Sequence, residues 1–432
     1  MFSQGKTFTS TSDITAFQVE KLKEQIQYLF SNSPFYQKLF EEEGILPSNI
    51  RTLEDLAKLP VTEKEQLQNQ NSNFLCIDKE NIAEYFTTSG TLGEPLIFPL
   101  STNDLERLAY NEYLSFKQIG AKKGDIVLVT VTSDKCFMAG NAYALGARKA
   151  GLTVIKTGPG LPEFQWSTIL KLRPTIIIAV PSFIIKLIEY AEKNGIDYKN
   201  SSVKKALCVG EPLRSRDLKN NQLANKIVEK WPIQLFSTYA STEMSTAFTE
   251  CTLGRGGHLN PELIIIECLD ENNNPVAEGT PGEITATTIG VEAMPLLRFK
   301  TGDIAVLHKD QCKCGNINPR IGPIIGRNKQ MIKYKGTTLY PDAIKQTLQS
   351  IDVLEDYYIE VSTDTFGMDD LTIHMAIKNH KLEIEKEIAD AFRSHIRVVP
   401  KLSFKQLKEI QEVKNRSNSR KPLDFLDNRT TN

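Results

Sequence analysis

A short stretch of hydroxyl-bearing residues stands out in this sequence of 432 residues. Between Phe86 and Pro95 the chain reads TTSGTLGE, with four hydroxyl residues and two glycines, and apolar residues lie on both sides. Glycine lets backbone N–H groups converge and hydroxyls add donors without bulk, so a turn of this kind after a strand can hold an anion. The same composition is common in surface loops. The turn is not a Walker-type loop, because no Gly-Lys-Ser/Thr follows it.

Further polar segments follow later in the chain. They are VGEPL at 209–213, STYASTEM at 237–244, RFKTGDIA at 298–305, IIGRNKQMIKYKG at 324–336 and SRKPLDFLDNR at 419–429. In this order, and with NSPFYQKLF and LEDLAKLPVTEK near the N-terminus, they resemble the adenylate-forming enzymes and, more narrowly, the phenylacetate–CoA ligase branch. The resemblance covers almost the whole chain.

The resemblance implies a two-step reaction. A carboxylate attacks the α-phosphate of ATP to give an acyl-adenylate and pyrophosphate, and the thiol of coenzyme A then displaces AMP. Both steps need stabilised oxyanions more than covalent chemistry by the protein. The β- and γ-phosphates would contact Thr87, Thr88, Ser89, Gly90, Thr91 and Gly93. The wider family usually has a lysine shortly after this turn, and here the chain reads Glu94-Pro95-Leu96.

The resemblance also assigns the nucleotide contacts. Adenine would lie along Gly210, Glu211 and Pro212 and stack on Tyr239, beside Ala240 and Ser241. Thr242 would contact the α-phosphate, and Glu243 would hold Mg²⁺ as a hard oxygen ligand. Asp303 would accept from both ribose hydroxyls, and Arg327 would contact the nucleotide. Without the resemblance these positions read as ordinary turns, and Glu243 as an acid in the first turn of a helix.

Lysines near the C-terminus complete the implied machinery. Lys329 matches the hinge about which the family's C-terminal domain rotates between the two half-reactions. Lys421 would bridge the attacking carboxylate and the α-phosphate. Lys333, Lys335 and Gly336 would meet coenzyme A. Exposed lysines in strands and polar tails are the alternative reading.

Soft metal ligands occur in two groups. CKC at 312–314 supplies Cys312 and Cys314, and ECTLGRGGH at 250–258 supplies Cys251 and His258. Three thiols and an imidazole suit tetrahedral Zn²⁺, although spacing alone leaves zinc and unmetallated thiols equally open. The same pattern occurs in the branch this chain resembles, which favours a structural zinc. Cys76, Cys136, Cys208 and Cys268 lie among apolar residues and are predicted to be buried thiols.

The resemblance places the acid near SDKCFMAGNAYALGARKAG at 133–151. Phe137, Met138, Asn141, Tyr143 and Ala240 would line its pocket. A helix rich in Gly and Ala also packs closely without binding anything. An arylacetate, a benzoate and a medium-chain acid all stay open.

These residues need a scaffold, and the patterning predicts one. From residue 125 to 241, strand-sized apolar runs such as TIIIAV alternate with helical patterns, which indicates an α/β fold with a mostly parallel sheet flanked by helices. A helix is predicted over 214–231. The stretch 258–308 predicts an antiparallel element. We predict a domain boundary after residue 328, with an α/β domain over 1–328 and a small α+β domain over 329–432. The resemblance implies that the first domain carries out adenylation and that the second is mobile.

Composition narrows the class of protein. The net charge is -1, and no run approaches the length needed to span a bilayer, so neither nucleic acid nor membrane is an expected partner. Seven scattered cysteines suit a reducing compartment, and we expect a cytoplasmic protein. The resemblance is compatible with a homodimer. Two other functions stay open: adenylation with transfer to a carrier-protein thiol or another acceptor, and a nucleotide-binding homologue without catalysis.

Overall fold

The structure is a computed structural model that describes residues 4–88, 96–134, 136–327, 330, 332–334, 337–364, 369–378, 382–396, 398–415 and 423–429. These residues fall into two compact units. The larger comprises most of the chain up to Pro323, and the smaller comprises Gly302–Ile304 and the chain from Ile324 onward. Residues 328 and 329, where the sequence places the domain boundary, lie outside the described residues, so that boundary stays a prediction.

The larger unit begins with two helices, α1 (Thr11–Asn32) and α2 (Pro34–Glu42). Ser33 separates them: its side chain accepts from the backbone N–H of Tyr36, and proline occupies the first turn of α2. Short 3₁₀ turns and α3 (Lys64–Asn69) follow, then the hairpin of β1 (Glu84–Thr87) and β2 (Ile97–Leu100). The two helices bury one aromatic and aliphatic core, in which Phe35 stacks on Phe74 at 3.9 Å between ring centroids.

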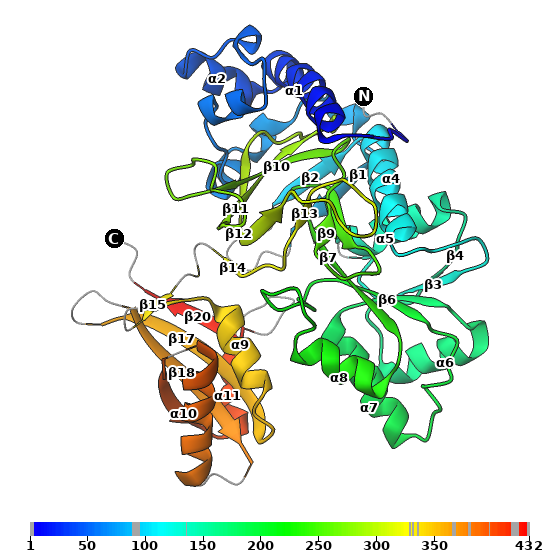
Figure 1. Cartoon of the computed structure of the whole chain (residues 1–432), viewed down its shortest axis with the longest axis vertical. Helices are drawn as coiled ribbons and strands as arrows, with labels where there is room; N and C mark the ends of the chain where they lie inside the picture. Colours follow the sequence, from blue (N-terminus) through cyan, green and yellow to red (C-terminus); the bar gives the residue numbers. More distant parts are fainter. Residues whose placement is uncertain are drawn as a thin grey trace. The chain divides into compact units, whose positions relative to one another are not determined.

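A parallel sheet flanked by helices forms the next layer (Figure 1). Its strands are β3 (Ile126–Val129), β4 (Thr153–Lys156), β5 (Ile176–Ala179), β6 (Lys205–Cys208) and β7 (Gln234–Ser241). Its helices are α4 (Thr102–Gln118), α5 (Met138–Lys149), α6 (Pro162–Leu172), α7 (Pro181–Lys193) and α8 (Gln222–Lys230). Successive residues of a strand face opposite sides, so Ile177 packs with α6, α7 and α8 whereas Ile178 packs with α4 and α5. The predicted α/β fold is confirmed.

The sheet continues beyond β7 in antiparallel fashion. The added strands are β8 (Thr246–Glu250), β9 (Gly257–His258), β10 (Ile264–Leu269), β11 (Pro281–Thr288), β12 (Phe299–His308) and β13 (Arg320–Ile321). They join the parallel strands in one twelve-stranded sheet of the described residues, in the order β10-β11-β12-β13-β9-β8-β7-β6-β5-β3-β4, with β14 (Gly326–Arg327) paired to β12. The antiparallel element predicted over 258–308 is therefore part of the main sheet.

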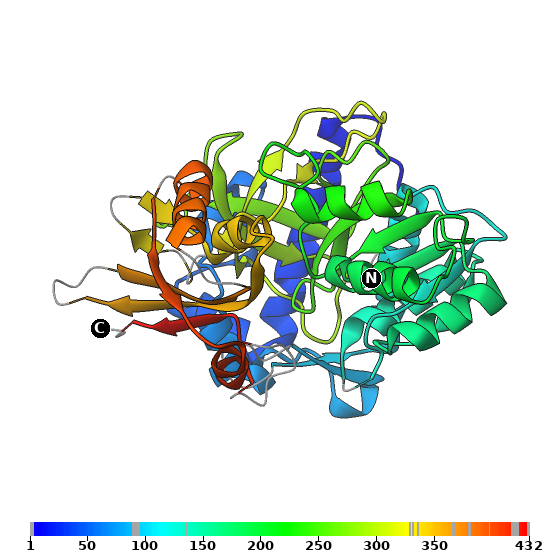
Figure 2. The same cartoon turned by 90° about the horizontal axis from the view of Figure 1, so that it is seen from below.

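The smaller unit is a four-stranded sheet covered by helices (Figure 2). Its strands are β17 (Leu354–Thr363), β18 (Asp369–Ile377), β19 (Lys401–Phe404) and β20 (Phe425–Asn428), accompanied by the β15 (Ile332–Tyr334) and β16 (Thr337–Leu339) hairpin. Helices α9 (Pro341–Gln349) and α10 (Leu382–Ile396) bury one face, and α11 (Leu407–Lys414) packs Ile410 on the other. None of the helices in the described residues is both long and apolar enough to cross a bilayer.

Two expectations about local structure were wrong. The helix predicted over 214–231 forms only from Gln222, because Asn221 caps it and residues 214–220 fold into a turn closed by a bridge between Arg214 and Asn220. Cys136, predicted to be buried, is exposed in a backbone conformation with φ of 55°. Cys76, Cys208 and Cys268 are buried as predicted.

A buried carboxyl group lies where α4 crosses α5. Glu112 is 3% exposed, accepts from Asn111 at 3.0 Å and packs against the backbone of Gly146, where any side chain would collide with it. Burial raises the pKa of Glu112 from its ordinary value of 4.5 to about 7, although hydrogen bonds from Ser115 and Asn111 oppose the shift. The folded state therefore binds this proton more tightly than the unfolded state does.

Stability should consequently fall as the pH rises. The contribution of Glu112 to the free energy of unfolding is complete below the pKa of the unfolded state. It is lost between about pH 4.5 and 7, and this loss lowers the free energy of unfolding by about 3 kcal/mol. We expect Glu112→Gln to raise the thermal midpoint by several degrees at pH 8 and to change it little at pH 5, measured by scanning calorimetry. Glu106→Gln, on the exposed face of the same helix, is the matched control. A difference in thermal midpoint between Glu112→Gln and wild-type protein that does not change with pH would contradict the raised pKa of Glu112.

Candidate functional site

The turn after β6 is bound to the start of α7, the helix that follows the neighbouring strand β5. Gly210 has a φ of 79°, which favours glycine, and the Glu211 carboxylate accepts from the backbone N–H and the hydroxyl of Ser182, both at 2.8 Å. Ser182 lies at the N-terminus of α7, where a carboxylate is favoured. The carbonyl of Pro212 accepts from Asn221 at 2.7 Å. The three residues predicted to lie along adenine thus form a fixed turn at the carboxyl edge of the sheet, where parallel sheets bind ligands.

The neighbouring turn joins β7 to β8 and contains the predicted phosphate and magnesium residues. Tyr239 is half-buried, with its ring centroid 6.1 Å from that of Phe248, and Ala240 is exposed. The Ser241 hydroxyl accepts from the N–H of Met244 at 3.2 Å, and the Thr242 carbonyl accepts from the N–H of Ser245 at 3.1 Å. Glu243 lies in this tight turn and not in a helix. Hydroxyl and carboxylate groups are therefore held at the end of the last parallel strand.

A buried arginine that the sequence analysis missed holds this turn from below. Arg107 of α4 is 1% exposed and donates to the carbonyl of Ser245 at 2.7 Å, to that of Leu263 at 2.6 Å and to that of Ile289 at 2.8 Å. Burial lowers the pKa of Arg107 to about 10, so it stays charged at neutral pH. Its partners are distant in sequence, so no local pattern could have identified it.

Lys64 is a second residue that the sequence analysis did not assign. Its ammonium lies 3.7 Å from the Glu243 carboxylate, whose side chain is 13% exposed. Thr62, two residues earlier, is bound to the edge of β12: its N–H donates to the Arg298 carbonyl and its carbonyl accepts from Lys300, both at 2.9 Å. The resemblance implies a cation near the phosphates, but no local pattern in the sequence connects that role to Lys64.

The structure describes only the start of the hydroxyl-rich turn, at Thr87 and Thr88. Thr87 ends β1, and Thr88 is buried with its hydroxyl accepting from the N–H of Leu96 at 3.0 Å. The turn therefore connects two paired strands. Ser89, Gly90, Thr91 and Gly93 lie outside the described residues.

The smaller unit contains two further residues that were predicted, separately, to contact the nucleotide. Asp303 on β12 faces Arg327 on β14 in register, and Nε of Arg327 lies 3.2 Å from Oδ1 of Asp303. The carboxylate that was predicted to bind ribose is thus paired with the arginine that was predicted to contact the nucleotide. Lys329, Lys335, Gly336 and Lys421 lie outside the described residues, so their roles stay predictions.

The residues predicted to contact the acid differ in exposure. Met138 and Tyr143 are buried, and the Tyr143 ring packs edge-on to Phe116 at 6.4 Å. Asn141 donates to Glu84 at 3.3 Å, and Phe137 is half-buried. A cavity of about 550 Å³ lies elsewhere, lined by α1 and residues 289–292 together with neighbouring loops, and none of the predicted acid-binding residues lines it. The acid pocket therefore stays a prediction.

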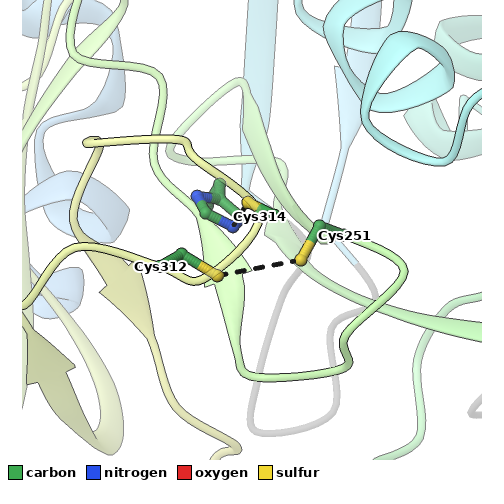
Figure 3. A group of neighbouring side chains, drawn as sticks. Cys251, Cys312 and Cys314 are labelled. Carbon is green, nitrogen blue, oxygen red and sulfur yellow. Dashed lines mark hydrogen bonds between the residues drawn. The ribbon is translucent and has the colours of Figure 1, made fainter.

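The four predicted metal ligands lie together. Figure 3 labels the three cysteines of the group. One donor atom from each of Cys251, His258, Cys312 and Cys314 lies within 4.8 Å of the others. Sγ of Cys251 is 3.9 Å from Sγ of Cys312, and Sγ of Cys314 is 3.7 Å from Nε2 of His258. Two ligand atoms on one tetrahedral zinc lie about 3.5 to 3.8 Å apart, so the donor set fits that ion in chemistry and spacing.

Strand pairing explains how the two halves of this cluster meet. Cys251 follows β8, His258 ends β9, and the cysteine turn joins β12 to β13. Strand β9 lies between β8 and β13, with His258 opposite Arg320. Gly257 permits this close pairing, because a Cβ there would lie 2.3 Å from the carbonyl oxygen of Phe248. Burial and the nearby Arg320 lower the pKa of His258 to about 4, so the imidazole is neutral at neutral pH.

Comparison with known proteins identifies the class. Residues 18–293 match the family of AMP-binding enzymes, and the chain belongs to this family. It is 28% identical over 416 residues to the phenylacetate-coenzyme A ligase of Thermus thermophilus, covering 90% of this chain and 92% of that protein. It is 27% identical over 379 residues to the phenylacetate-coenzyme A ligase of Aromatoleum evansii, covering 85% and 82%. The resemblance to adenylate-forming enzymes and to this branch is thereby confirmed.

A solved structure shares the fold. The crystal structure of 2-hydroxyisobutyryl-CoA ligase in the postadenylation state, in complex with R3-HIB-AMP, has a TM-score of 0.83 to this chain. The two sequences are 22% identical, and the alignment covers 97% of this chain and 90% of that one. The likeness confirms the two-unit α/β architecture.

Proposed function

We propose that this protein is an AMP-forming acid–CoA ligase that activates an aryl, phenylacetate-like carboxylic acid with ATP and transfers it to coenzyme A. The observation that carries the proposal is the turn between β7 and β8. There Arg107 fixes the turn that presents Thr242 and Glu243 at the carboxyl edge of the sheet, next to Tyr239 near the end of β7, in a chain of the AMP-binding family. The similarity to two phenylacetate-coenzyme A ligases over most of their length supports the substrate class.

Each residue of this turn has a role in the proposed adenylation. The Tyr239 ring stacks on adenine, and the Thr242 hydroxyl donates to the α-phosphate as charge develops there. Glu243 would hold Mg²⁺, which supplies positive charge between phosphate oxygens. Lys64, 3.7 Å from Glu243, offers a cation that the sequence Glu94-Pro95-Leu96 after the hydroxyl-rich turn lacks.

A non-catalytic nucleotide-binding homologue is the competing function. The absence of a lysine directly after the hydroxyl-rich turn favours it, and Lys421 within SRKPLDF argues against it, because a binding protein has no use for that lysine. Thioester formation decides between them. Purified protein with ATP, Mg²⁺, free coenzyme A and a panel of aryl and alkyl acids should yield aryl-CoA thioesters and AMP. If the acyl group is transferred only to a carrier-protein thiol, the acceptor is that carrier protein and not coenzyme A. If the protein binds AMP but forms no product, the result favours the non-catalytic homologue.

We further propose that Cys251, His258, Cys312 and Cys314 hold a structural zinc ion. Three thiolates and a neutral imidazole close a tetrahedral site, which leaves no open position and suits a structural role. The ion would tie the cysteine turn to β8 and β9, and its binding energy would contribute to folding.

Metal analysis tests this zinc site. Protein purified without chelator should contain one zinc per chain by plasma mass spectrometry, and a strong chelator should lower its thermal midpoint. Cys312→Ser should lose the metal and the associated stability. Cys136→Ser, which removes an exposed thiol outside the cluster, should keep both. Zinc-free wild-type protein with an unchanged midpoint would contradict the proposal.

A further inference from the structure

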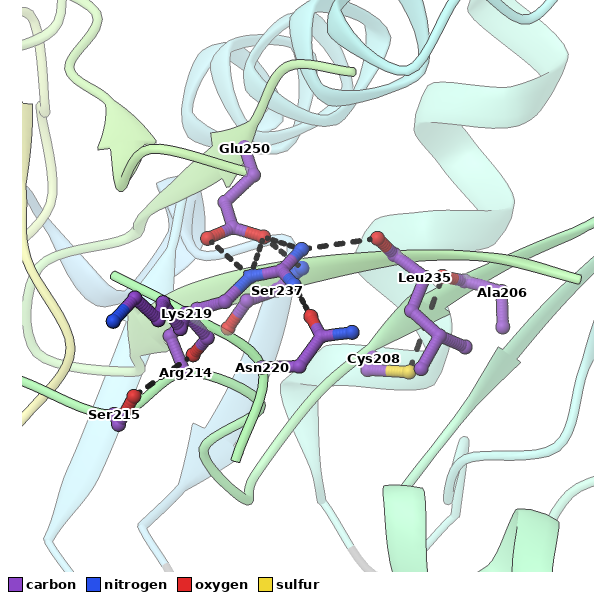
Figure 4. A network of polar contacts seen from close by, with 9 residues as sticks. All are labelled: Ala206, Cys208, Arg214, Ser215, Lys219, Asn220, Leu235, Ser237 and Glu250. Atoms are coloured by element: carbon purple, nitrogen blue, oxygen red, sulfur yellow. Dashed lines mark hydrogen bonds and ion pairs between the residues drawn. The ribbon is translucent and has the colours of Figure 1, made fainter. Parts of the chain in front are cut away.

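An ion pair between Arg214 and Glu250 joins the turn after β6 to the end of β8, directly before Cys251 of the cysteine–histidine cluster (Figure 4). Nε of Arg214 lies 3.1 Å from each carboxylate oxygen of Glu250, and Nη2 lies 2.9 Å from Oε2. The side chains are 12% and 2% exposed, respectively. Arginine–carboxylate contacts of this kind fix orientation as well as supplying energy, and breaking a buried pair leaves one charge unpaired.

The same pair also holds the start of β7. Nη2 of Arg214 donates to the carbonyl of Leu235 at 3.3 Å, and the Glu250 carboxylate accepts from the N–H of Ser237 at 3.0 Å. Both partners belong to the strand that runs on to Tyr239. The guanidinium also donates to Asn220, just before the cap of α8. The Arg214 side chain therefore holds both turns that we propose to bind adenine, the one after β6 and the one at the end of β7.

On its other side the guanidinium of Arg214 packs against the loop of residues 251–256, which begins with the predicted ligand Cys251 and is called the metal loop below. Glu250 directly precedes Cys251, and the loop is closed by a bond from the N–H of Gly254 to the Cys251 carbonyl at 3.0 Å. Gly254 has a φ of 60°, and a Cβ on it would lie 2.7 Å from Nη2 of Arg214. The loop thus packs against the arginine with no room for a side chain.

We propose that Arg214 is a positioning residue through which metal binding at the cysteine–histidine cluster and adenine-nucleotide binding at the β6 and β7 turns strengthen each other. The inference rests on the proposed function, because it takes these turns as the nucleobase site. Arg214 is not among the residues to which we assign the metal or the adenine. Instead, the ordered metal loop holds Glu250 and the guanidinium, and these hold the turns. Coupling of this kind is reciprocal, so nucleotide must retain metal as strongly as metal favours nucleotide.

Variants of Arg214 test one direction of this coupling. We expect Arg214→Met to raise the Kd for AMP, measured by calorimetry, roughly 10- to 100-fold, and to raise KM for ATP with a much smaller change in KM for the acid. Arg214→Lys should be intermediate, because an ammonium cannot reproduce the forked contact. Lys219→Met, which removes an exposed charge in the same loop, is the control and should bind AMP normally. Equal AMP affinity in Arg214→Met and wild-type protein would overturn the inference.

The zinc affinity of unaltered protein tests the other direction, without relying on a variant that folds. In an equilibrium competition with a chromogenic chelator, the protein should bind zinc several-fold more tightly with saturating AMP than without it, and Arg214→Met should remove this difference. AMP that binds wild-type protein but leaves its zinc affinity unchanged would overturn the coupling alone. Wild-type protein that binds zinc but not AMP would overturn the proposed function as well.

Discussion

Lys421→Ala should abolish acyl-adenylate formation while leaving thioester formation from supplied acyl-AMP largely intact. In the first step an anionic carboxylate must approach an anionic α-phosphate, and a lysine bridging the two offsets their repulsion. Loss of one such donor costs roughly 100- to 1,000-fold in rate. In the second step the thiol of coenzyme A attacks the uncharged acyl carbonyl of the acyl-adenylate, and AMP leaves. The predicted rotation of the C-terminal domain about Lys329 would separate the two steps.

The two half-reactions separate this role from a structural one. Adenylation is measured as the release of pyrophosphate. Thioester formation is measured as the consumption of coenzyme A when synthetic acyl-AMP is supplied. Arg420→Ala changes the adjacent cation and should retain most of the adenylation rate. Equal loss of both half-reactions in Lys421→Ala would contradict a lysine that acts in the first step only.

Glu243→Gln should reduce adenylation by roughly 100- to 1,000-fold and shift its Mg²⁺ dependence to higher concentration. The amide keeps the size of the side chain in the tight turn that Arg107 holds, but it removes the charge that a hard cation requires. Initial rates over a range of Mg²⁺ concentrations measure both effects.

Lys64→Met provides the comparison for Glu243. It breaks the same 3.7 Å ion pair from the other side, so a purely structural role for the pair predicts equal effects of the two variants. We expect Lys64→Met to raise KM for ATP while leaving the Mg²⁺ dependence unchanged. Matching Mg²⁺ profiles in the two variants would show that Glu243 does not hold the metal.

The sequence predicted those features whose physical cause is local or chemical. Periodic apolar residues predicted the alternating strands and helices, and the softness of three thiols and one imidazole selected the cluster ligands although about fifty residues separate its halves. The clustering itself depends on β9 lying between β8 and β13, which no short window of sequence reveals.

Residues that act through distant partners could not be predicted in this way. Arg107 contacts three carbonyls from segments more than 130 residues away, and Lys64 reaches Glu243 only because Thr62 is bound to the edge of β12. The helix predicted to begin at Arg214 begins later, because the buried carboxylate of Glu250 holds the guanidinium in a turn. In each case a tertiary contact overrode or bypassed the local pattern.

Acid-dependent exchange of labelled pyrophosphate into ATP tests the central claim most directly, because exchange requires reversible formation of an acyl-adenylate and nothing after it. We predict exchange that depends on Mg²⁺ and on an aryl carboxylic acid, that needs no coenzyme A, and that disappears in Glu243→Gln. Folded protein that binds ATP yet exchanges no pyrophosphate with any acid of a broad panel would contradict the account.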